Sequence, residues 1–192
     1  MAVKVQPEHD NAAGNAWLKR YYFVRAVFSF LWVAAILTLP AGASAVVGAL
    51  LVVYPAWDAA ANLVDARRNG GMRHNRTQAL NTAVSTATAV AVAIALSMSM
   101  NAVLGVFGVW ASLAGLLQLA TAVRRWKSYG AQWPMALSGG QSAVVGVMFL
   151  KQANAPEVPG VSTIAGYAAF GAIYFVASAL FLVVSDRRRR NA

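Results

Sequence analysis

The chain has no cysteine among its 192 residues, and charged residues make up only 11% of it. The lack of cysteine excludes a disulfide framework, a thiol nucleophile and a cysteine-ligated zinc site. Soluble domains carry about a quarter charged residues, so a chain this poor in charge cannot cover a water-facing surface. Because 59% of the residues are hydrophobic, the sequence predicts that lipid surrounds most of the protein.

Acidic residues and histidines are also few. The chain has six Asp and Glu residues and two histidines, His9 and His74. Neither histidine has neighbours at the spacing of a metal site, and the phosphate-loop, serine-hydrolase and zinc-protease motifs are missing from the sequence. We therefore expect a non-enzymatic protein without catalytic residues, cofactor or metal.

The 16 lysines and arginines give a formal net charge of +10. In a soluble protein this excess would suggest a nucleic-acid partner. Here the basic residues fall in short clusters between apolar runs, a pattern typical of membrane topology signals. We expect no nucleic-acid partner, and we expect the basic loops to attract anionic lipid headgroups by about 1 kcal/mol per charge.

Long apolar runs are what the chain has in abundance. A bilayer core about 30 Å thick requires roughly 20 apolar residues per helix, and only helices or closed barrels satisfy the backbone there. The candidate spans are residues 21–39, 43–64, 79–96, 101–123, 133–150 and 162–185. The sequence thus predicts an all-α membrane protein with six transmembrane helices within residues 17–186. A disordered tail, 1–16, and a basic tail, 187–192, flank this domain.

The connectors between the spans alternate in charge. "PAGA", "SMSMN" and "QANAPEVPG" are nearly uncharged, whereas "ARRNGGMRHNR", "RRWKSYGAQ" and "DRRRRNA" are basic. If the N-terminus is cytoplasmic, every lysine and arginine except Lys151 falls on that side, as the positive-inside rule requires. We expect a multi-pass protein of the bacterial inner membrane with both termini in the cytoplasm. A cleaved signal peptide ending near "AGASA" is the alternative, and it would leave an odd number of spans.

The second, fourth and sixth spans resemble one another. Gly48 precedes Arg67 by 19 residues and Gly105 precedes Arg124 by 19, so these two copies are offset by 57. A third copy, "IAGYAAFGAIYFVASALFLVVSDRR", begins near Gly166. The pattern predicts three tandem helical hairpins, at about residues 20–68, 77–125 and 132–188, although glycine- and alanine-rich spans that end in arginine also align by chance.

Polar residues form a stripe on the second span. Tyr54, Asp58, Asn62 and Asp65 share one helical face. We expect Asp65 at the membrane interface and Asp58 about two turns deeper, where Arg25 of the first span offers a partner. One interpretation is a structural ion pair that locks the first hairpin, since a lone charge at this depth costs about 2.5–3.5 kcal/mol. The other is a proton or cation site in which Asp58 titrates, assisted by Asn62 or Tyr54.

Small residues mark one face of the fourth span, namely Gly105, Gly108, Ala111 and Gly115. Small side chains let two helices approach closely. This face is therefore predicted to pack against another helix, either within the chain or in a homo-oligomer.

Residues 105–150, "GVFGVWASLAGLLQLATAVRRWKSYGAQWPMALSGGQSAVVGVMFL", resemble the HdeD family of short-repeat bacterial membrane proteins. A glycine-rich span exits there through basic residues, crosses a Trp-bearing loop and re-enters through "SGG". The resemblance extends over roughly residues 20–186. It implies a six-helix inner-membrane protein, with acid-stress resistance attributed to the namesake, and it supplies no catalytic residues. The polar N-terminal tail and the acidic second span depart from the family.

These observations leave three functions open. The first is a non-enzymatic HdeD-type membrane protein in envelope or acid stress. The second is a small transporter or channel that uses Arg25 and Asp58, which requires a cavity reaching Asp58. The third is a membrane scaffold or partner subunit, which requires an exposed small-residue face.

Overall fold

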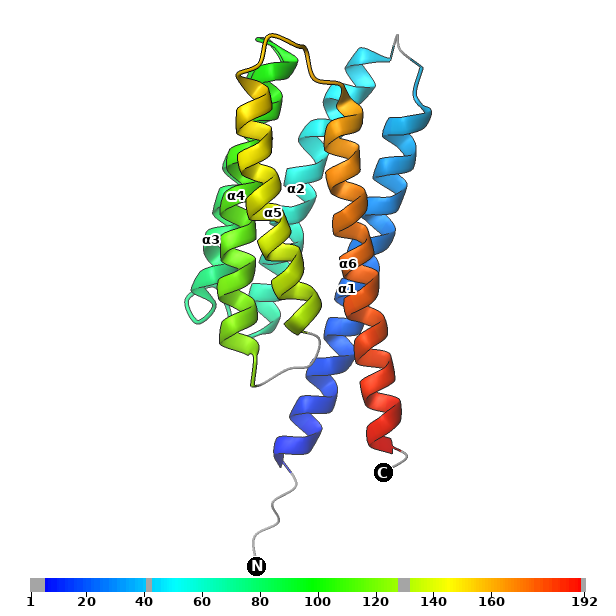
Figure 1. Ribbon diagram of the computed structural model, residues 1–192. Coiled ribbons are helices and arrows are strands. Elements are labelled where there is room, and N and C mark those ends of the chain that lie inside the picture. The colour runs from blue at the N-terminus through cyan, green and yellow to red at the C-terminus, as the bar shows by residue number, and fades with distance from the viewer. Residues whose placement is uncertain (1–5, 41–42, 128–131, 191–192) are drawn as a thin grey trace, which may run out of the picture.

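The computed structural model describes residues 6–40, 43–127 and 132–190, and this part of the chain forms six helices that lie side by side (Figure 1). They are α1 (Gln6–Thr38), α2 (Ser44–Arg68), α3 (Arg76–Ala95), α4 (Met100–Arg125), α5 (Gln132–Ala153) and α6 (Val161–Arg190). Each contains a stretch long and apolar enough to cross a bilayer. This confirms the predicted all-α fold with six candidate spans and indicates a multi-pass membrane protein.

Two helices extend beyond the predicted spans. α1 begins at Gln6, inside the segment predicted to be disordered up to residue 16, and α6 continues to Arg190, through the predicted basic tail. Hydropathy marks only the part of a helix that lipid can surround. A helix that leaves the bilayer continues in water wherever the residues allow it, so its ends cannot be read from apolar runs.

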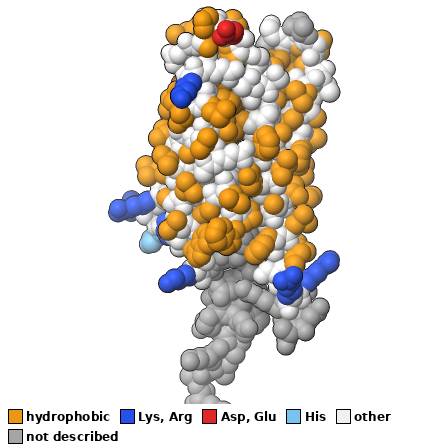
Figure 2. Space-filling view, viewed as in Figure 1, with side chains coloured by type: hydrophobic (Ala, Val, Ile, Leu, Met, Phe, Trp, Pro, Cys, Tyr) orange, Lys and Arg blue, Asp and Glu red, His pale blue; other side chains and the backbone are white. Residues whose placement is uncertain are grey.

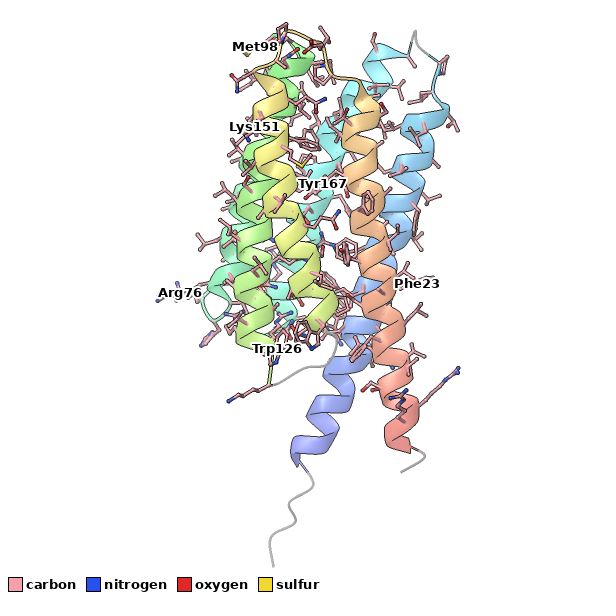
Figure 3. The ribbon with its side chains drawn as sticks, in the orientation of Figure 1. Phe23, Arg76, Met98, Trp126, Lys151 and Tyr167 are labelled. Carbon is pink, nitrogen blue, oxygen red and sulfur yellow. The ribbon has the colours of Figure 1, made fainter. Side chains whose placement is uncertain are left out.

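Hydrophobic side chains cover much of the face of the bundle that Figure 2 shows. Large hydrophobic side chains such as Leu31, Val90, Val144 and Ile173 are more than half exposed. Basic side chains gather at the end where α1 begins and α6 ends, whereas Lys151 lies toward the opposite end (Figure 3). We call these the basic end and the far end. An apolar belt above a basic end is the surface expected of a protein that spans a membrane.

The six helices form a closed ring in which close and loose packing alternate. The closely packed neighbours are α1 with α6, α2 with α3, and α4 with α5, whereas α1 with α2, α3 with α4, and α5 with α6 make fewer contacts. The looser pairs are those that the short far-end turns connect, the pairs predicted as hairpins. A short turn keeps two helices adjacent, but the side chains between them decide how closely they pack.

Glycines explain the closest contact, between α4 and α5. A Cβ atom on Gly115 would lie 2.6 Å from the carbonyl oxygen of Gly139, and one on Gly146 would lie 2.6 Å from that of Gly108. Real side chains never approach backbone so closely, so only glycine permits this separation of the helices.

The small-residue face of α4 is therefore covered within the chain. Ala111 on this face is fully buried, and a Cβ atom on Gly105 would meet the Cβ atom of Ala153 at an ordinary 3.6 Å. The face that could have bound another subunit is occupied by α5.

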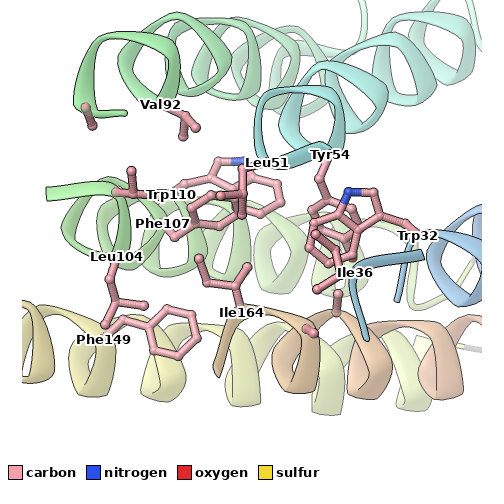
Figure 4. Close-up of a cluster of buried hydrophobic side chains, with 14 residues drawn as sticks. Trp32, Ile36, Leu51, Tyr54, Val92, Leu104, Phe107, Trp110, Phe149 and Ile164 are labelled. Atoms are coloured by element: carbon pink, nitrogen blue, oxygen red, sulfur yellow. The ribbon is translucent and has the colours of Figure 1, made fainter. Parts of the chain in front are cut away.

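Two apolar clusters fill the interior at different heights. The larger one lies in the far half of the bundle and includes Trp32, Leu51, Phe107 and Ile164 (Figure 4). The smaller one lies near the basic end and consists of Leu18, Tyr22, Ala122, Met135 and Leu182. Buried polar residues such as Asp58 and Ser85 lie between the two, and others such as Asp65 and Arg125 lie at the level of the smaller cluster.

Candidate functional site

Three aromatic residues from alternate helices meet at the centre of the ring. Tyr54 of α2 contacts Trp110 of α4 edge to face, with ring centroids 5.9 Å apart and planes at 88°. Trp110 contacts Tyr167 of α6 in the same way, at 6.3 Å and 85°. Edge-to-face contacts between aromatic rings contribute about 0.5–1.5 kcal/mol beyond the area they bury. The trio links the three even-numbered helices.

Each of these aromatic residues is hydrogen-bonded to a serine that precedes it by 25 residues, on the odd-numbered helix before it. The Trp110 indole Nε1 donates to Ser85 Oγ at 2.9 Å. The hydroxyls of Ser142 and Tyr167 lie 3.1 Å apart, and those of Ser29 and Tyr54 lie 3.5 Å apart. The same contact thus occurs three times in the ring.

These serine–aromatic pairs set the register of the internal repeat. Ser85 follows Ser29 by 56 residues, and Ser142 follows Ser85 by 57. The predicted offset of 57 is therefore right for the second and third copies and one residue too long for the first and second. The predicted match of Gly105 to Gly166 is four residues out of this register, because it aligned glycines and not the hydrogen-bonded serine and aromatic positions.

A cavity of about 80 Å³ lies on the basic-end side of the aromatic trio. Equivalent positions of the three repeats line it: Arg25, Asn81 and Ser138; Asp58, Ala114 and Gly171; and Asn62, Gln118 and Phe175. The charged residues in these sets, Arg25 and Asp58, belong to the first repeat. The second and third repeats have small, polar uncharged or aromatic side chains at the equivalent positions. The helices of the ring are therefore arranged with approximate threefold symmetry, whereas the side chains that line the cavity do not follow this symmetry.

Asp58 lies in the wall of this cavity and binds three other residues. Arg25 Nη2 donates to Oδ1 of Asp58, and Oδ2 accepts from Ser85 Oγ at 2.7 Å and from Asn62 Nδ2 at 2.9 Å. The residue is 7% exposed. The predicted partner Arg25 is thus in contact, and Tyr54 lies one turn above in the trio. The carboxylate joins α1, α2 and α3.

Arg25 has further contacts of its own. Its Nη1 donates to the Tyr21 hydroxyl at 2.8 Å, and its guanidinium carbon lies 4.4 Å from the ring centroid of Phe175 on α6. A cation over an aromatic face is stabilised by the ring quadrupole. Arg25 therefore connects α6 to the same network.

Asp65 forms a second buried ion pair, where an interfacial position was predicted. It is fully buried, and its Oδ2 accepts from Arg125 Nη2 at 3.0 Å and from Gln78 Nε2 at 2.9 Å. Trp17 Nε1 donates to Oδ1 at 3.3 Å. The interfacial depth predicted for Asp65 stays a prediction, but its partner was missed, because Arg125 was counted only among the topology signals. The clue was that Asp65 and Arg125 both lie near the basic ends of their helices, so that neighbouring helices can bring them together.

Four buried polar atoms around the cavity have no hydrogen-bond partner within the described protein. They are the Tyr22 hydroxyl, Arg25 Nε, Trp57 Nε1 and Asn81 Oδ1. An unpartnered buried polar atom costs about 1–3 kcal/mol, so several of them around one cavity require an explanation. Three can donate and two can accept, which suits a small polar guest. In the described part of the chain, no three His, Cys, Asp or Glu residues gather as a metal site would require.

Comparison with protein families identifies part of this architecture. Residues 80–151 match DUF308, the short repeat of unknown function. This family includes HdeD-like membrane proteins. The DUF308 match begins within α3 and ends within α5, so it contains the Ser85–Trp110 pair and the glycine contacts of α4 with α5. No curated protein and no solved structure matches the chain.

Proposed function

We propose that the chain is a non-enzymatic protein of the bacterial inner membrane, of the HdeD type, that holds a small polar solute in its central cavity and acts as a small transporter. The observation that carries this proposal is the cavity itself, which reaches Asp58 in the interior of the bundle and is lined by all three repeats. Membrane transporters commonly bind their substrates between internal repeats, near the middle of the bilayer.

The apolar clusters above and below the cavity fit an occluded state of such a transporter. The cluster around Phe107 and Trp110 closes the far side, and the cluster around Tyr22 and Met135 closes the basic end. Access requires helices to move apart. The looser contacts between α1 and α2, α3 and α4, and α5 and α6 are where such movement would be least costly.

The size and charge of the cavity limit its guest. One water molecule requires roughly 10–15 Å³ of such volume, so about 80 Å³ accommodates several waters or a solute of a few heavy atoms. Arg25 is paired with Asp58 and Arg125 with Asp65. Because these charges compensate one another, the lining favours a neutral polar solute over an ion.

A structural role of the Arg25–Asp58 pair is compatible with this proposal and is favoured by a separate observation. The Asp58 carboxylate already has three donors, so it is a brace that fixes the cavity wall. We place the solute against the unpartnered atoms of Tyr22 and Asn81. A role in envelope or acid stress rests on the match of residues 80–151 to DUF308, a family that includes HdeD-like membrane proteins.

Cysteine labelling tests whether the cavity is reached from water, because the chain has no native cysteine. Ala114→Cys places a thiol in the cavity wall, and Leu113→Cys places one on the lipid-facing side of the same helix, where Leu113 is 43% exposed. We expect a small water-soluble methanethiosulfonate reagent to modify Ala114→Cys and to leave Leu113→Cys largely unmodified. If neither reacts, the cavity is sealed and the structural role alone remains.

Flux measurements test transport directly. Proteoliposomes containing the wild-type protein should swell faster in an inward glycerol gradient than empty liposomes. Ala114→Leu fills the cavity and should abolish the difference, whereas Leu113→Ala, on the lipid-facing surface, should retain it. Equal swelling with and without protein would contradict transport of small neutral solutes.

A further inference from the structure

A groove of about 350 Å³ runs between α1 and α2 at the basic end of the bundle. It lies where the ring is most loosely packed, and it opens toward lipid, because Val24 and Val64 on its two walls are 42% and 49% exposed. We propose that this groove is a binding site for one anionic phospholipid. The groove shares Tyr21, Arg25 and Trp57 with the wall of the central cavity but opens toward lipid, and the proposal does not depend on any transported solute.

The apolar part of the groove suits an acyl chain. Val24 of α1 and Val64 of α2 form the sides, and the small side chains of Ala60 and Ala61 leave the space between them. An acyl chain that lies in such a groove gains contact with two helices at once, where a chain at a flat surface contacts one.

The polar part of the groove is cationic. Arg20 is exposed at its mouth, and nearby the Arg68 guanidinium stacks on Trp17 at 4.7 Å from the ring centroid. Trp17 and Tyr21 lie at this level, and such aromatic residues are typical of the headgroup region of a membrane. Arg20 and Arg68 are therefore placed to meet a lipid phosphate.

Two unpartnered donors lie deeper in the same groove. Trp57 Nε1 and Arg25 Nε are both buried without a hydrogen-bond partner, and both residues line the groove. Arg25 follows Arg20 by five residues, which is roughly 7 Å along a helix. In a phospholipid the ester carbonyl oxygens likewise lie deeper in the membrane than the phosphate. The two levels of donors thus correspond to the two levels of acceptors.

The charge of the groove selects the type of headgroup. Among the described residues that line it, none is acidic. A zwitterionic lipid would bring an ammonium group with no carboxylate to receive it, next to two arginines. An anionic lipid such as phosphatidylglycerol brings only the phosphate charge and neutral hydroxyls, so it is the occupant we infer.

Lipid-dependent unfolding of the purified, delipidated protein tests the site. Titration with phosphatidylglycerol should raise the unfolding temperature in a saturable way, and phosphatidylcholine or inorganic phosphate at equal concentrations should not. Native mass spectrometry should show one retained phosphatidylglycerol. Equal effects of both lipids, or a full effect of inorganic phosphate, would refute an anionic-phospholipid site.

Two variants locate the site in the groove. Trp57→Phe removes the unpartnered Nε1 and keeps the ring that stacks on Phe28 at 4.4 Å, so it should fold normally and lose roughly tenfold in phosphatidylglycerol affinity. Arg20→Gln should lose roughly fivefold.

Matched changes elsewhere on the molecule serve as controls. Arg76 and Trp133 are exposed and lie on other helices, outside the groove. Arg76→Gln and Trp133→Phe should bind phosphatidylglycerol as the wild type does. If they weaken binding as much as the groove variants, the lipid associates diffusely with the basic end and the proposed site is wrong.

Discussion

Two aspartates of α2 hold four helices together through buried ion pairs. Asp58 receives hydrogen bonds from α1 and α3, and Asp65 receives them from α3 and α4 as well as from Trp17 of α1. Asp58 is 7% exposed and Asp65 is fully buried, so the removal of one member of a pair leaves a buried charge without its counter-charge. The loss of one member of such a pair therefore costs more than the pair itself contributes to stability.

Asp58→Ala should consequently destabilise the protein strongly. The change leaves the Arg25 guanidinium buried beside an apolar side chain, and we expect a loss of about 3–5 kcal/mol in the free energy of unfolding. Replacing both partners, with Arg25→Met and Asp58→Leu together, should cost less than Asp58→Ala alone. Unfolding in mixed detergent micelles measures the three stabilities.

The partly exposed pair of Lys19 and Asp186 provides a control for this experiment. Their side chains are 28% and 23% exposed, and pairs of this kind contribute about 0–1 kcal/mol. Lys19→Ala should therefore have a small effect. If Asp58→Ala proves as mild as Lys19→Ala, the brace function of Asp58 is wrong.

At the residue scale, the sequence indicates how deep a charged residue lies in its span, but it does not identify every residue that the charge contacts. The depth of Arg25 and Asp58 in adjacent spans was enough to pair them, and the structure contains that pair. The bond to Ser85 had no such signal, because the third span contains several serines and threonines. Which of them faces α2 depends on helix rotation, and apolar periodicity does not define rotation when lipid surrounds the helices.

At the scale of elements, glycines determine which helices pack most closely. A Cβ atom on Gly146 would lie 2.5 Å from the Ser112 backbone nitrogen, whereas one on Gly140 of the same helix has nothing within 4 Å. The sequence shows both glycines within "SGGQSAVVG", and it does not show which of them faces α4. The six spans were predicted from composition, but their pairing depended on such contacts.

Gly146→Ala should separate α4 from α5. The added methyl group overlaps backbone that cannot move without displacing a helix, so we expect a loss of about 1–3 kcal/mol or more. Gly140→Ala should leave stability unchanged or raise it by up to about 1 kcal/mol, because alanine is the better helix former and space is free there. Thermal unfolding of the two variants in one detergent compares them directly, and equal stabilities would contradict this account of the interface.

At the scale of the whole molecule, three repeats build one ring whose chemistry is concentrated in the first. Ser29, Ser85 and Ser142 are each hydrogen-bonded to an equivalent aromatic residue. What the three repeats share is therefore the way in which their helices pack. The repeat was visible in the sequence, while its register required the hydrogen bonds. α1 begins and α6 ends at the basic end (Figure 1). Because basic residues mark the cytoplasmic side of a membrane protein, we predict that this end faces the cytoplasm.

Single cysteines test that orientation in living bacteria. Met98 lies 72% exposed at the far end, between α3 and α4, and Arg73 is exposed at the basic end, between α2 and α3. A membrane-impermeant maleimide should label Met98→Cys in intact spheroplasts and Arg73→Cys only after the membrane is opened. The reverse result would mean that the arginines face outward against the positive-inside rule. Labelling of both positions in intact spheroplasts would mean that α3 does not cross the membrane, and the six-span topology would then be wrong.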